Sequence, residues 1–307
     1  MTRVCLIFPG QGAQEVGMGK EIYETSVEAR EIFEEANIVI PGLTDIIFNG
    51  PADRLTSTGY CQPAIYTYSI AALTALQKHA IYQQLDPQYT CGLSLGECSA
   101  VAASGALSFE EGLMMVKHRA AFMEEACRAT QGSMAAIIGF DKIQLKDICD
   151  SVGASVANYN SPDQIVITGE VEAVTAACKK IKEAGAKRVI PLTVSGAFHS
   201  TLMAAAVPKF RSVLDHLSFN DPKRPLISNV DAQPAMTGDQ IKSNLSRQII
   251  SSVLWEDSIN YVSAQGVRHF IEIGPGNVLK GLLRQIDRDL TVFNVRTPGD
   301  IEKIKLS

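Results

Sequence analysis

Residues 92–96 read Gly-Leu-Ser-Leu-Gly, a Gly-x-Ser-x-Gly motif that follows a short apolar stretch and precedes a run of small residues. Such a motif is typical of a serine on a tight turn between a strand and a helix, where two glycines let the backbone pass close to the hydroxyl. Ser94 is therefore a candidate nucleophile. The amide of Leu95, at the start of the helix, is a candidate donor to an oxyanion. An ordinary turn is the alternative, because a motif of five residues is only moderately specific.

Composition narrows the class of protein. The chain has 307 residues, of which 46% are hydrophobic and 20% charged, enough for one large domain with an insertion or for two domains. A net charge of −5 without an arginine-rich run argues against nucleic-acid binding. The apolar residues Val4–Phe8 fit a buried strand better than a signal-peptide core. No stretch approaches the roughly 20 apolar residues of a membrane span.

Cysteine and histidine spacing bears on compartment and cofactors. Seven cysteines without a Cys-x-x-Cys pair indicate reduced thiols in apolar surroundings, and five scattered histidines offer no metal spacing. We therefore expect a cytoplasmic protein, a monomer, that binds neither nucleic acid nor membrane and uses no metal or organic cofactor.

Strands and helices alternate from the N-terminus, which is typical of an α/β fold with a parallel sheet. A strand at Val4–Phe8, a glycine-rich turn and a helix reaching about Ala36 come first. Residues 89–93 lead into the serine turn as a strand. Further helices are expected over residues 63–79, 95–104 and 109–129.

Residues 131–194 show a different order of expected secondary-structure elements. The order is strand–helix–strand–strand–helix–strand, the split βαβ arrangement of a ferredoxin-like domain. The expected elements are 134–139, 143–152, 155–160, 164–168, 171–184 and 187–192. Residues 226–230 and 270–273 then read as strands and a helix starts at Asp239, so the large-domain pattern resumes. We predict residues 131–194 as a small domain inserted into a large domain formed by 1–130 and 195–307.

A serine nucleophile needs a base, and a charged substrate needs a side chain of opposite charge. His199 lies just after the expected insertion and is the best placed of the five histidines, although a hydrogen-bonded loop histidine is the alternative. No Asp or Glu lies close to it in sequence, so an acid from elsewhere or a neutral carbonyl would orient it. Arg119, on an apolar helix face, could bind a carboxylate through two hydrogen bonds or simply cover apolar surface. The glycine loop after the first strand lacks a nucleotide-binding pattern, and the amide of Gln11 in it is a candidate second oxyanion donor.

Together these segments resemble the malonyl-CoA:acyl carrier protein transacylases of fatty-acid synthesis and, more broadly, the acyltransferase domains of polyketide synthases. The matching stretches keep the family's order from residue 8 to about 285. They are 8–12 (Phe-Pro-Gly-Gln-Gly), 62–64, 92–97, Arg119, 158–162, 197–200, 228–231 and 272–276. The resemblance implies an α/β-hydrolase-like large domain with an inserted ferredoxin-like small domain.

The resemblance also implies a role for each matching residue. Ser94 matches the nucleophile that carries the malonyl ester and His199 its general base, while Gln248 matches the residue whose carbonyl oxygen holds that histidine. Arg119 matches the partner of the malonate carboxylate. The remaining matches are Gln11 and Leu95 for the oxyanion hole and Gln62, Asn160 and Phe198 for substrate binding. The ring of Phe198 would crowd a substrate α-methyl group. Leu93 stands where the family usually has a histidine.

We therefore expect an acyltransferase that moves a malonyl group from malonyl-CoA to the phosphopantetheine thiol of acyl carrier protein, in fatty-acid biosynthesis, through a malonyl-serine intermediate. The alternatives are a trans-acting polyketide acyltransferase and a serine hydrolase of acyl thioesters. A non-catalytic docking protein would be favoured only by Leu93. Carrier proteins are usually acidic, so Lys187-Arg188 and Lys223-Arg224 are candidate contacts for the carrier.

Overall fold

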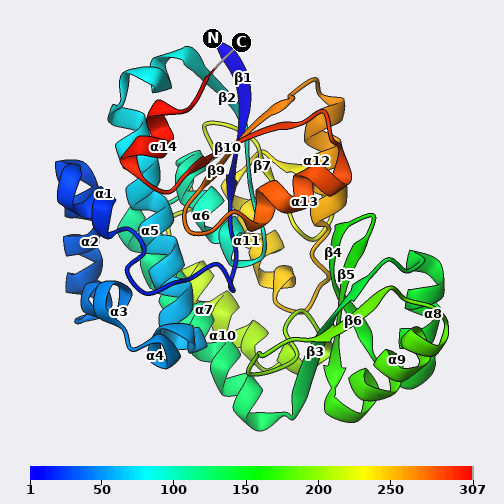
Figure 1. Cartoon of the computed structure of the whole chain (residues 1–307). Coiled ribbons are helices and arrows are strands. Elements are labelled where there is room, and N and C mark those ends of the chain that lie inside the picture. Colours follow the sequence, from blue (N-terminus) through cyan, green and yellow to red (C-terminus); the bar gives the residue numbers. More distant parts are fainter. Residues whose placement is uncertain (306–307) are drawn as a thin grey trace.

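The larger part of the chain is built on a six-stranded sheet with the order β10-β9-β1-β2-β7-β8 (Figure 1). The computed structural model describes residues 1–305. All neighbouring strands in this sheet run parallel except the last pair. The strands are β1 (Thr2–Phe8), β2 (Leu85–Gly92), β7 (Leu226–Ile227), β8 (Pro234–Ala235), β9 (His269–Ile273) and β10 (Thr291–Val295).

Both faces of this sheet are covered. Along β1, Val4 and Leu6 join one apolar cluster while Cys5 and Ile7 join another, because successive side chains of a strand point to opposite faces. The second cluster is covered by α12 (Trp255–Ala264) and α13 (Val278–Ile286). The helices that contribute to the first cluster are α1 (Lys20–Thr25), α2 (Val27–Val39), α3 (Leu43–Asn49), α4 (Ala52–Thr56), α5 (Thr58–Lys78), α6 (Leu95–Ser104), α7 (Phe109–Ala129), α10 (Ala206–Asp215), α11 (Gly238–Gln248) and α14 (Pro298–Glu302). Two short 3-10 helices, η1 (Ala80–Gln84) and η2 (Thr201–Met203), complete this part.

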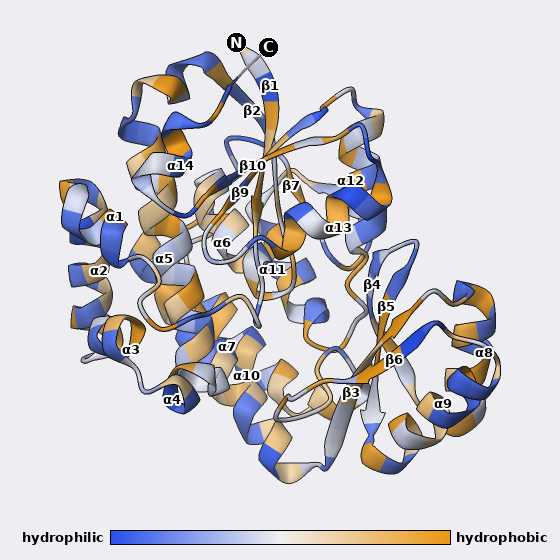
Figure 2. Cartoon of the chain, in the orientation of Figure 1, coloured by the Kyte–Doolittle hydropathy of each residue, from blue (hydrophilic) through white to orange (hydrophobic). Residues whose placement is uncertain are grey.

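A separate four-stranded antiparallel sheet has the order β4-β5-β3-β6. Its elements follow one another as β3 (Gly132–Ile138), α8 (Lys142–Val152), β4 (Ser155–Ser161), β5 (Gln164–Glu170), α9 (Val171–Glu183) and β6 (Arg188–Pro191). The two helices pack on one face, and Figure 2 shows hydrophilic and hydrophobic residues alternating along them, as expected of helices with one face in water. The predicted fold class, a large α/β domain with a ferredoxin-like small domain, is confirmed. We propose residues 131–194 as the limits of the inserted domain, with 1–130 and 195 onward as the large one.

Two local predictions are wrong. The single helix expected up to Ala36 is two helices, α1 and α2, because Ser26 between them is extended and its hydroxyl accepts the Ala29 amide as a helix cap. The strand expected over residues 226–230 ends at Ile227, since the next residues form a turn closed by the Ser228 amide on the Gln233 carbonyl.

None of the helices in residues 1–305 is long and apolar enough to cross a membrane.

The turn between β2 and α6 is closely packed against the ends of the central strands. A Cβ atom on Gly92 would lie 1.9 Å from the carbonyl carbon of Gly96, and one on Gly96 would lie 2.1 Å from the carbonyl oxygen of Phe8. Only glycine fits at either position, so the N-terminus of α6 can sit directly against the ends of β1 and β2. In doubly covered α/β sheets, ligands bind outside these carboxyl ends of the strands.

Replacing Gly92 by alanine tests this constraint. Overpacking of backbone against backbone at 1.9 Å has no flexible side chain to absorb it, so we expect a loss of at least about 3 kcal/mol in the free energy of unfolding. Gly281, in α13, is the matched control, because its Cβ would meet no atom of residues 1–305 within 4 Å. There we expect a gain of about 0.5–1 kcal/mol. Urea unfolding followed by circular dichroism measures both, and an unchanged midpoint for Gly92→Ala would contradict the packing argument.

Candidate active site

Ser94 lies at the point where β2 turns into α6. Its backbone has φ 54° and ψ −106°, a conformation that non-glycine residues rarely adopt. Two contacts hold it there: the Ser94 amide donates to Asn229 Oδ1 at 2.7 Å, and the Gln248 Nε2 donates to the Ser94 carbonyl at 3.0 Å. The turn therefore lifts the hydroxyl out of the sheet and keeps it fixed.

His199 meets this hydroxyl directly. The Ser94 Oγ lies 2.7 Å from His199 Nε2, and His199 Nδ1 lies 2.9 Å from the backbone carbonyl oxygen of Gln248. A carbonyl can only accept a hydrogen bond, so Nδ1 carries the proton and Nε2 is left to accept the hydroxyl proton. A neutral carbonyl, not a carboxylate, therefore orients the imidazole.

The charge state of His199 follows from its surroundings. The side chain is buried, and burial together with the nearby Arg119 guanidinium lowers the pKa of His199 to about 4. The imidazole is therefore neutral around pH 7, which is the form that can take a proton from a serine.

Arg119 approaches the same hydroxyl from α7. Its guanidinium is 1% exposed and donates to Gln62 Oε1 at 2.7 Å, to Gln248 Oε1 at 2.8 Å and to Ser94 Oγ at 3.3 Å. Its Nε–H has no hydrogen-bond partner within residues 1–305. The group thus brings a buried positive charge next to the serine and keeps a donor free.

These groups open into a cavity of about 230 Å³ between the two domains. Eight of the nine predicted site residues line it, and Gln248 lies behind them. The eight are Gln11, Gln62, Ser94, Leu95, Arg119, Asn160, Phe198 and His199. Met134 and Val166 from the small sheet supply an apolar wall, joined by Leu93 from the large domain.

Three of the lining residues present unused hydrogen-bonding groups. The backbone amides of Gln11 and Leu95 donate to no other group in the described part of the chain, as two oxyanion donors would require. The buried Oδ1 of Asn160 likewise has no partner there. Within residues 1–305, no cluster of three or more His, Cys, Asp or Glu side chains could hold a metal ion.

Two residues of the site were not predicted from the sequence. Asn229 binds the serine turn through both side-chain atoms, since its Nδ2 also donates to the Gly92 carbonyl at 2.7 Å. Glu97 lies three residues after the serine, is fully buried and accepts the amide of Gln248. Both lie inside segments that carry the family resemblance, which was the one signal that could have drawn attention to them.

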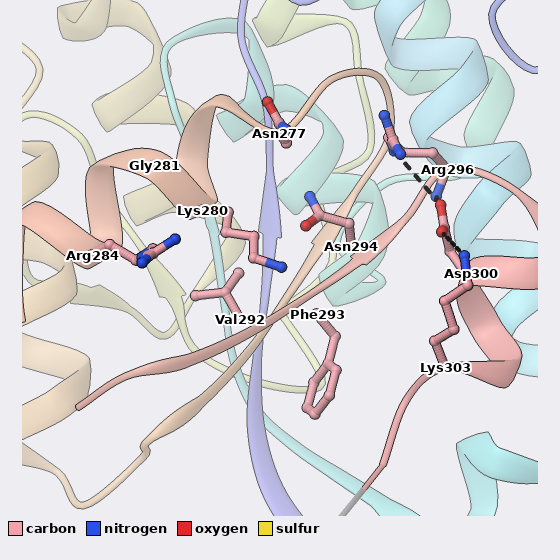
Figure 3. Close-up of a pocket in the computed structure, with 10 residues that line it drawn as sticks. All are labelled: Asn277, Lys280, Gly281, Arg284, Val292, Phe293, Asn294, Arg296, Asp300 and Lys303. Carbon is pink, nitrogen blue, oxygen red and sulfur yellow. Dashed lines mark hydrogen bonds and ion pairs between the residues drawn. The ribbon is translucent and has the colours of Figure 1, made fainter. Parts of the chain in front are cut away.

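A second cavity, of about 510 Å³, lies on the other face of α13 (Figure 3). Val278 and Leu282 face the first cavity, whereas Lys280 and Arg284 line the second. Neither of these two cations forms an ion pair with a carboxylate of the described residues; Arg296 and Lys303, in contrast, share Asp300. The outer face of α13 is therefore positively charged.

A serine hydroxyl hydrogen-bonded to a neutral histidine, in a cavity at the carboxyl end of a parallel strand, is typical of enzymes that transfer acyl groups through a serine ester. The acyl transferase domain family matches residues 5–294, and the chain belongs to that family. It is an acyltransferase.

Similar proteins cover nearly the whole chain. The malonyl CoA-acyl carrier protein transacylase of Bacillus subtilis (strain 168) is 45% identical over 308 residues, covering 98% of this chain and 96% of that protein. The acyl-carrier-protein-S-malonyltransferase of Bartonella henselae superposes with a TM-score of 0.94 at 38% identity, covering 99% and 98% of the two chains. A malonyl-transacylase solved in complex with a type II PKS acyl-carrier protein gives a TM-score of 0.92 at 33% identity, covering 99% and 98%.

Proposed function

We propose that this chain transfers a malonyl group from malonyl-CoA to the phosphopantetheine thiol of acyl carrier protein, in fatty-acid biosynthesis, through a malonyl ester on Ser94. The observation that carries the proposal is the buried Arg119 guanidinium 3.3 Å from a serine hydroxyl that is itself 2.7 Å from a neutral histidine. That arrangement suits an acyl group which ends in a carboxylate.

The first half-reaction loads the enzyme. His199 Nε2 takes the Ser94 proton while Oγ attacks the thioester carbonyl, and the amides of Gln11 and Leu95 hold the resulting oxyanion. The carbon–sulfur bond then breaks, and the coenzyme A thiol leaves with the proton from His199. The malonyl group stays on Ser94 as an ester.

The second half-reaction unloads it by the reverse steps. The carrier's thiol gives its proton to His199 and attacks the ester carbonyl. The carbon–oxygen bond breaks, and Ser94 regains its proton from His199. No redox or metal step enters, because a thioester is exchanged for an ester and back.

The rest of the cavity selects the acyl group. The free Nε–H of Arg119 and the amide of Asn160 offer hydrogen bonds to the malonyl carboxylate and thioester. Gln62 accepts a hydrogen bond from the guanidinium, and the ring of Phe198, which lines the same cavity, would crowd a methyl branch on the substrate. An uncharged acyl group would leave a buried charge without its partner, at a cost of about 3–5 kcal/mol.

One observation favours a polyketide carrier as the second candidate acceptor: a structural relative at 33% identity was solved with a type II PKS acyl-carrier protein. For the compartment we propose the cytoplasm, supported by seven cysteines that are all free thiols, six of them buried.

Intact-protein mass spectrometry after brief mixing with malonyl-CoA tests the function. We expect one malonyl adduct on the wild type and none on Ser94→Ala. Ser99→Ala is the matched control on the same helix; its buried hydroxyl has no partner among the described residues, so the variant should fold and form the adduct. Steady release of coenzyme A without carrier and without adduct would establish the hydrolase alternative, and an adduct on Ser94→Ala would refute the assigned nucleophile.

Arg119→Met tests the selection of malonyl. We expect kcat/KM for malonyl-CoA to fall about 10²–10³-fold, because a charge-assisted pair in a buried site is lost. The value of kcat/KM for acetyl-CoA should fall much less. Initial rates of coenzyme A release with both donors give the ratio. Arg128→Met is the control, since Arg128 is 77% exposed at the end of the same helix. An equal loss with both donors would show that Arg119 acts only on the serine.

The carrier surface is the third part of the proposal. The expected pair Lys223-Arg224 is remote, because Arg224 donates to the carbonyl of Ala103, at the end of α6 opposite to Ser94. We propose instead the outer face of α13, whose Lys280 and Arg284 have no ion-pair partner within residues 1–305 (Figure 3). Val278 and Leu282 of the same helix line the catalytic cavity.

Reversing both charges in Lys280→Glu/Arg284→Glu should raise KM for the carrier about 10-fold at low salt and leave the rate of Ser94 malonylation unchanged. Lys179→Glu/Lys182→Glu, on the exposed face of α9, makes the same charge change elsewhere. Carrier titrations at two salt concentrations measure the effect. Equal KM values for the two double variants would place the docking surface somewhere else.

A further inference from the structure

Glu97 is a buried carboxylate that the acyl-transfer steps do not use. It sits in the first turn of α6 with no exposed surface. Its Oε2 accepts a hydrogen bond from Gln248 Nε2 at 2.5 Å, and its Oε1 accepts one from the backbone amide of Asn229 at 3.3 Å. Both partners come from segments far along the chain, and both touch the serine.

Gln248 connects Glu97 to three groups of the site by hydrogen bonds. Its backbone carbonyl accepts from His199, its Oε1 accepts from Arg119, and its Nε2 donates to the Ser94 carbonyl. An amide side chain can flip and exchange its oxygen for its NH₂ group. Here the flip would turn two N–H donors toward the guanidinium, which has donors only.

Asn229 carries the second connection. Its Oδ1 accepts the Ser94 amide, and its Nδ2 donates to the Gly92 carbonyl. The position of its backbone, which Glu97 holds, therefore sets where the serine turn is anchored.

The two donors that face Glu97 explain why a carboxylate is needed. An ionised carboxylate accepts at both oxygens, whereas an amide or a protonated acid presents one acceptor and one donor. With only one acceptor, either the Asn229 amide or the Gln248 amide would meet a donor.

We propose that Glu97 is a positioning residue whose ionised carboxylate fixes the orientation of the Gln248 amide and the position of Asn229, and so holds the serine, histidine and arginine in register. This rests on the proposed function only for the identity of the acyl group. The reactivity of Ser94 itself reports on it with any serine reagent.

The charges around Glu97 bear on when it is ionised. Burial raises the pKa of Glu97 to about 7, against the hydrogen bonds from Gln248 and Asn229 and the attraction of Arg119 on α7, and Asp231 beyond β7 raises it further. The neighbouring thiol of Cys98 has a pKa raised to about 11 by burial, and His199 is neutral, so neither adds charge near pH 7.

Protonation of His199 and protonation of Glu97 predict different pH dependences for the rate of the Ser94 reaction. A base with the pKa of His199 alone would keep the rate level down to about pH 5. Protonation of Glu97 removes one of its two acceptors, so the rate of the wild type should already fall as the pH drops through 7. The rate falls near pH 7, above the pKa of His199, because protonated Glu97 no longer holds Gln248 and Asn229 in place.

The test compares the wild type, Glu97→Gln and Glu97→Asp in single-turnover labelling of Ser94 from pH 5 to 9. One arm uses malonyl-CoA and the other an alkyl fluorophosphonate, which reacts with the serine without needing a malonyl site. We expect Glu97→Gln to be about 10–100-fold slower than the wild type at pH 8.5, with a level profile, and equal to it at pH 5. Glu97→Asp should keep the acid limb near pH 7 at a lower rate.

Glu272→Gln is the matched control. Glu272 is equally buried and accepts the amides of Leu279 and Lys280 and the side chain of Asn294, away from the serine. It should lower stability and leave the acid limb in place. The proposal would be overturned if the ratio of the wild-type labelling rate to the Glu97→Gln rate were constant across pH. Loss of the fall in rate near pH 7 in Glu272→Gln would also overturn it. Failure of the malonyl arm alone, with the fluorophosphonate arm as expected, would count against the proposed function and not against Glu97.

Discussion

The lack of space between Gly92, Gly96 and the end of β1 is the constraint on which the rest of the site depends. Because neither glycine could carry a Cβ, the helix behind the serine starts against the sheet itself, and Leu95 at its N-terminus lines the cavity with a backbone amide that has no acceptor in the described residues. The price is local strain at Ser94, about 1–3 kcal/mol for a non-glycine residue with positive φ. The hydrogen bonds to Asn229 and Gln248 hold the residue in that conformation. Tight packing and nucleophile geometry are therefore one feature.

Arg119 is a buried charge whose side-chain partners are neutral amides. Its hydrogen bonds go to the amide oxygens of Gln62 and Gln248, which satisfy donors without neutralising the charge. A direct carboxylate partner would have made an ion pair and competed with the malonyl group. Burial and the nearby Arg119 charge together disfavour a proton on His199, which keeps the imidazole neutral near pH 7.

Secondary-structure elements that depend on local patterns could be predicted from the sequence. Side-chain contacts between segments far apart in the chain could not. The strand, turn and helix around Ser94, the helix 109–129 and the order of the small domain follow from periodicity and glycine placement, and the structure has them. Gln248 entered only through family resemblance, and Asn229 and Glu97 were given no role. Their contacts join positions 135 and 151 residues apart in sequence, and no periodicity encodes which buried amide faces which carboxylate. The break at Ser26 was missed because one cap competes with a continuous apolar pattern.

The inserted domain is tied to the catalytic groups by backbone, not only by the cavity wall. The Tyr159 amide of β4 donates to the Val253 carbonyl at 2.9 Å, and the Val253 amide donates to the Ala157 carbonyl at 2.8 Å. Val253 lies five residues after Gln248, whose carbonyl holds the ring of His199. The small sheet therefore contacts both the segment that follows the Gln248 carbonyl and, through Met134 and Val166, the cavity in front of Ser94. These two backbone hydrogen bonds therefore join the small sheet directly to the segment that follows Gln248.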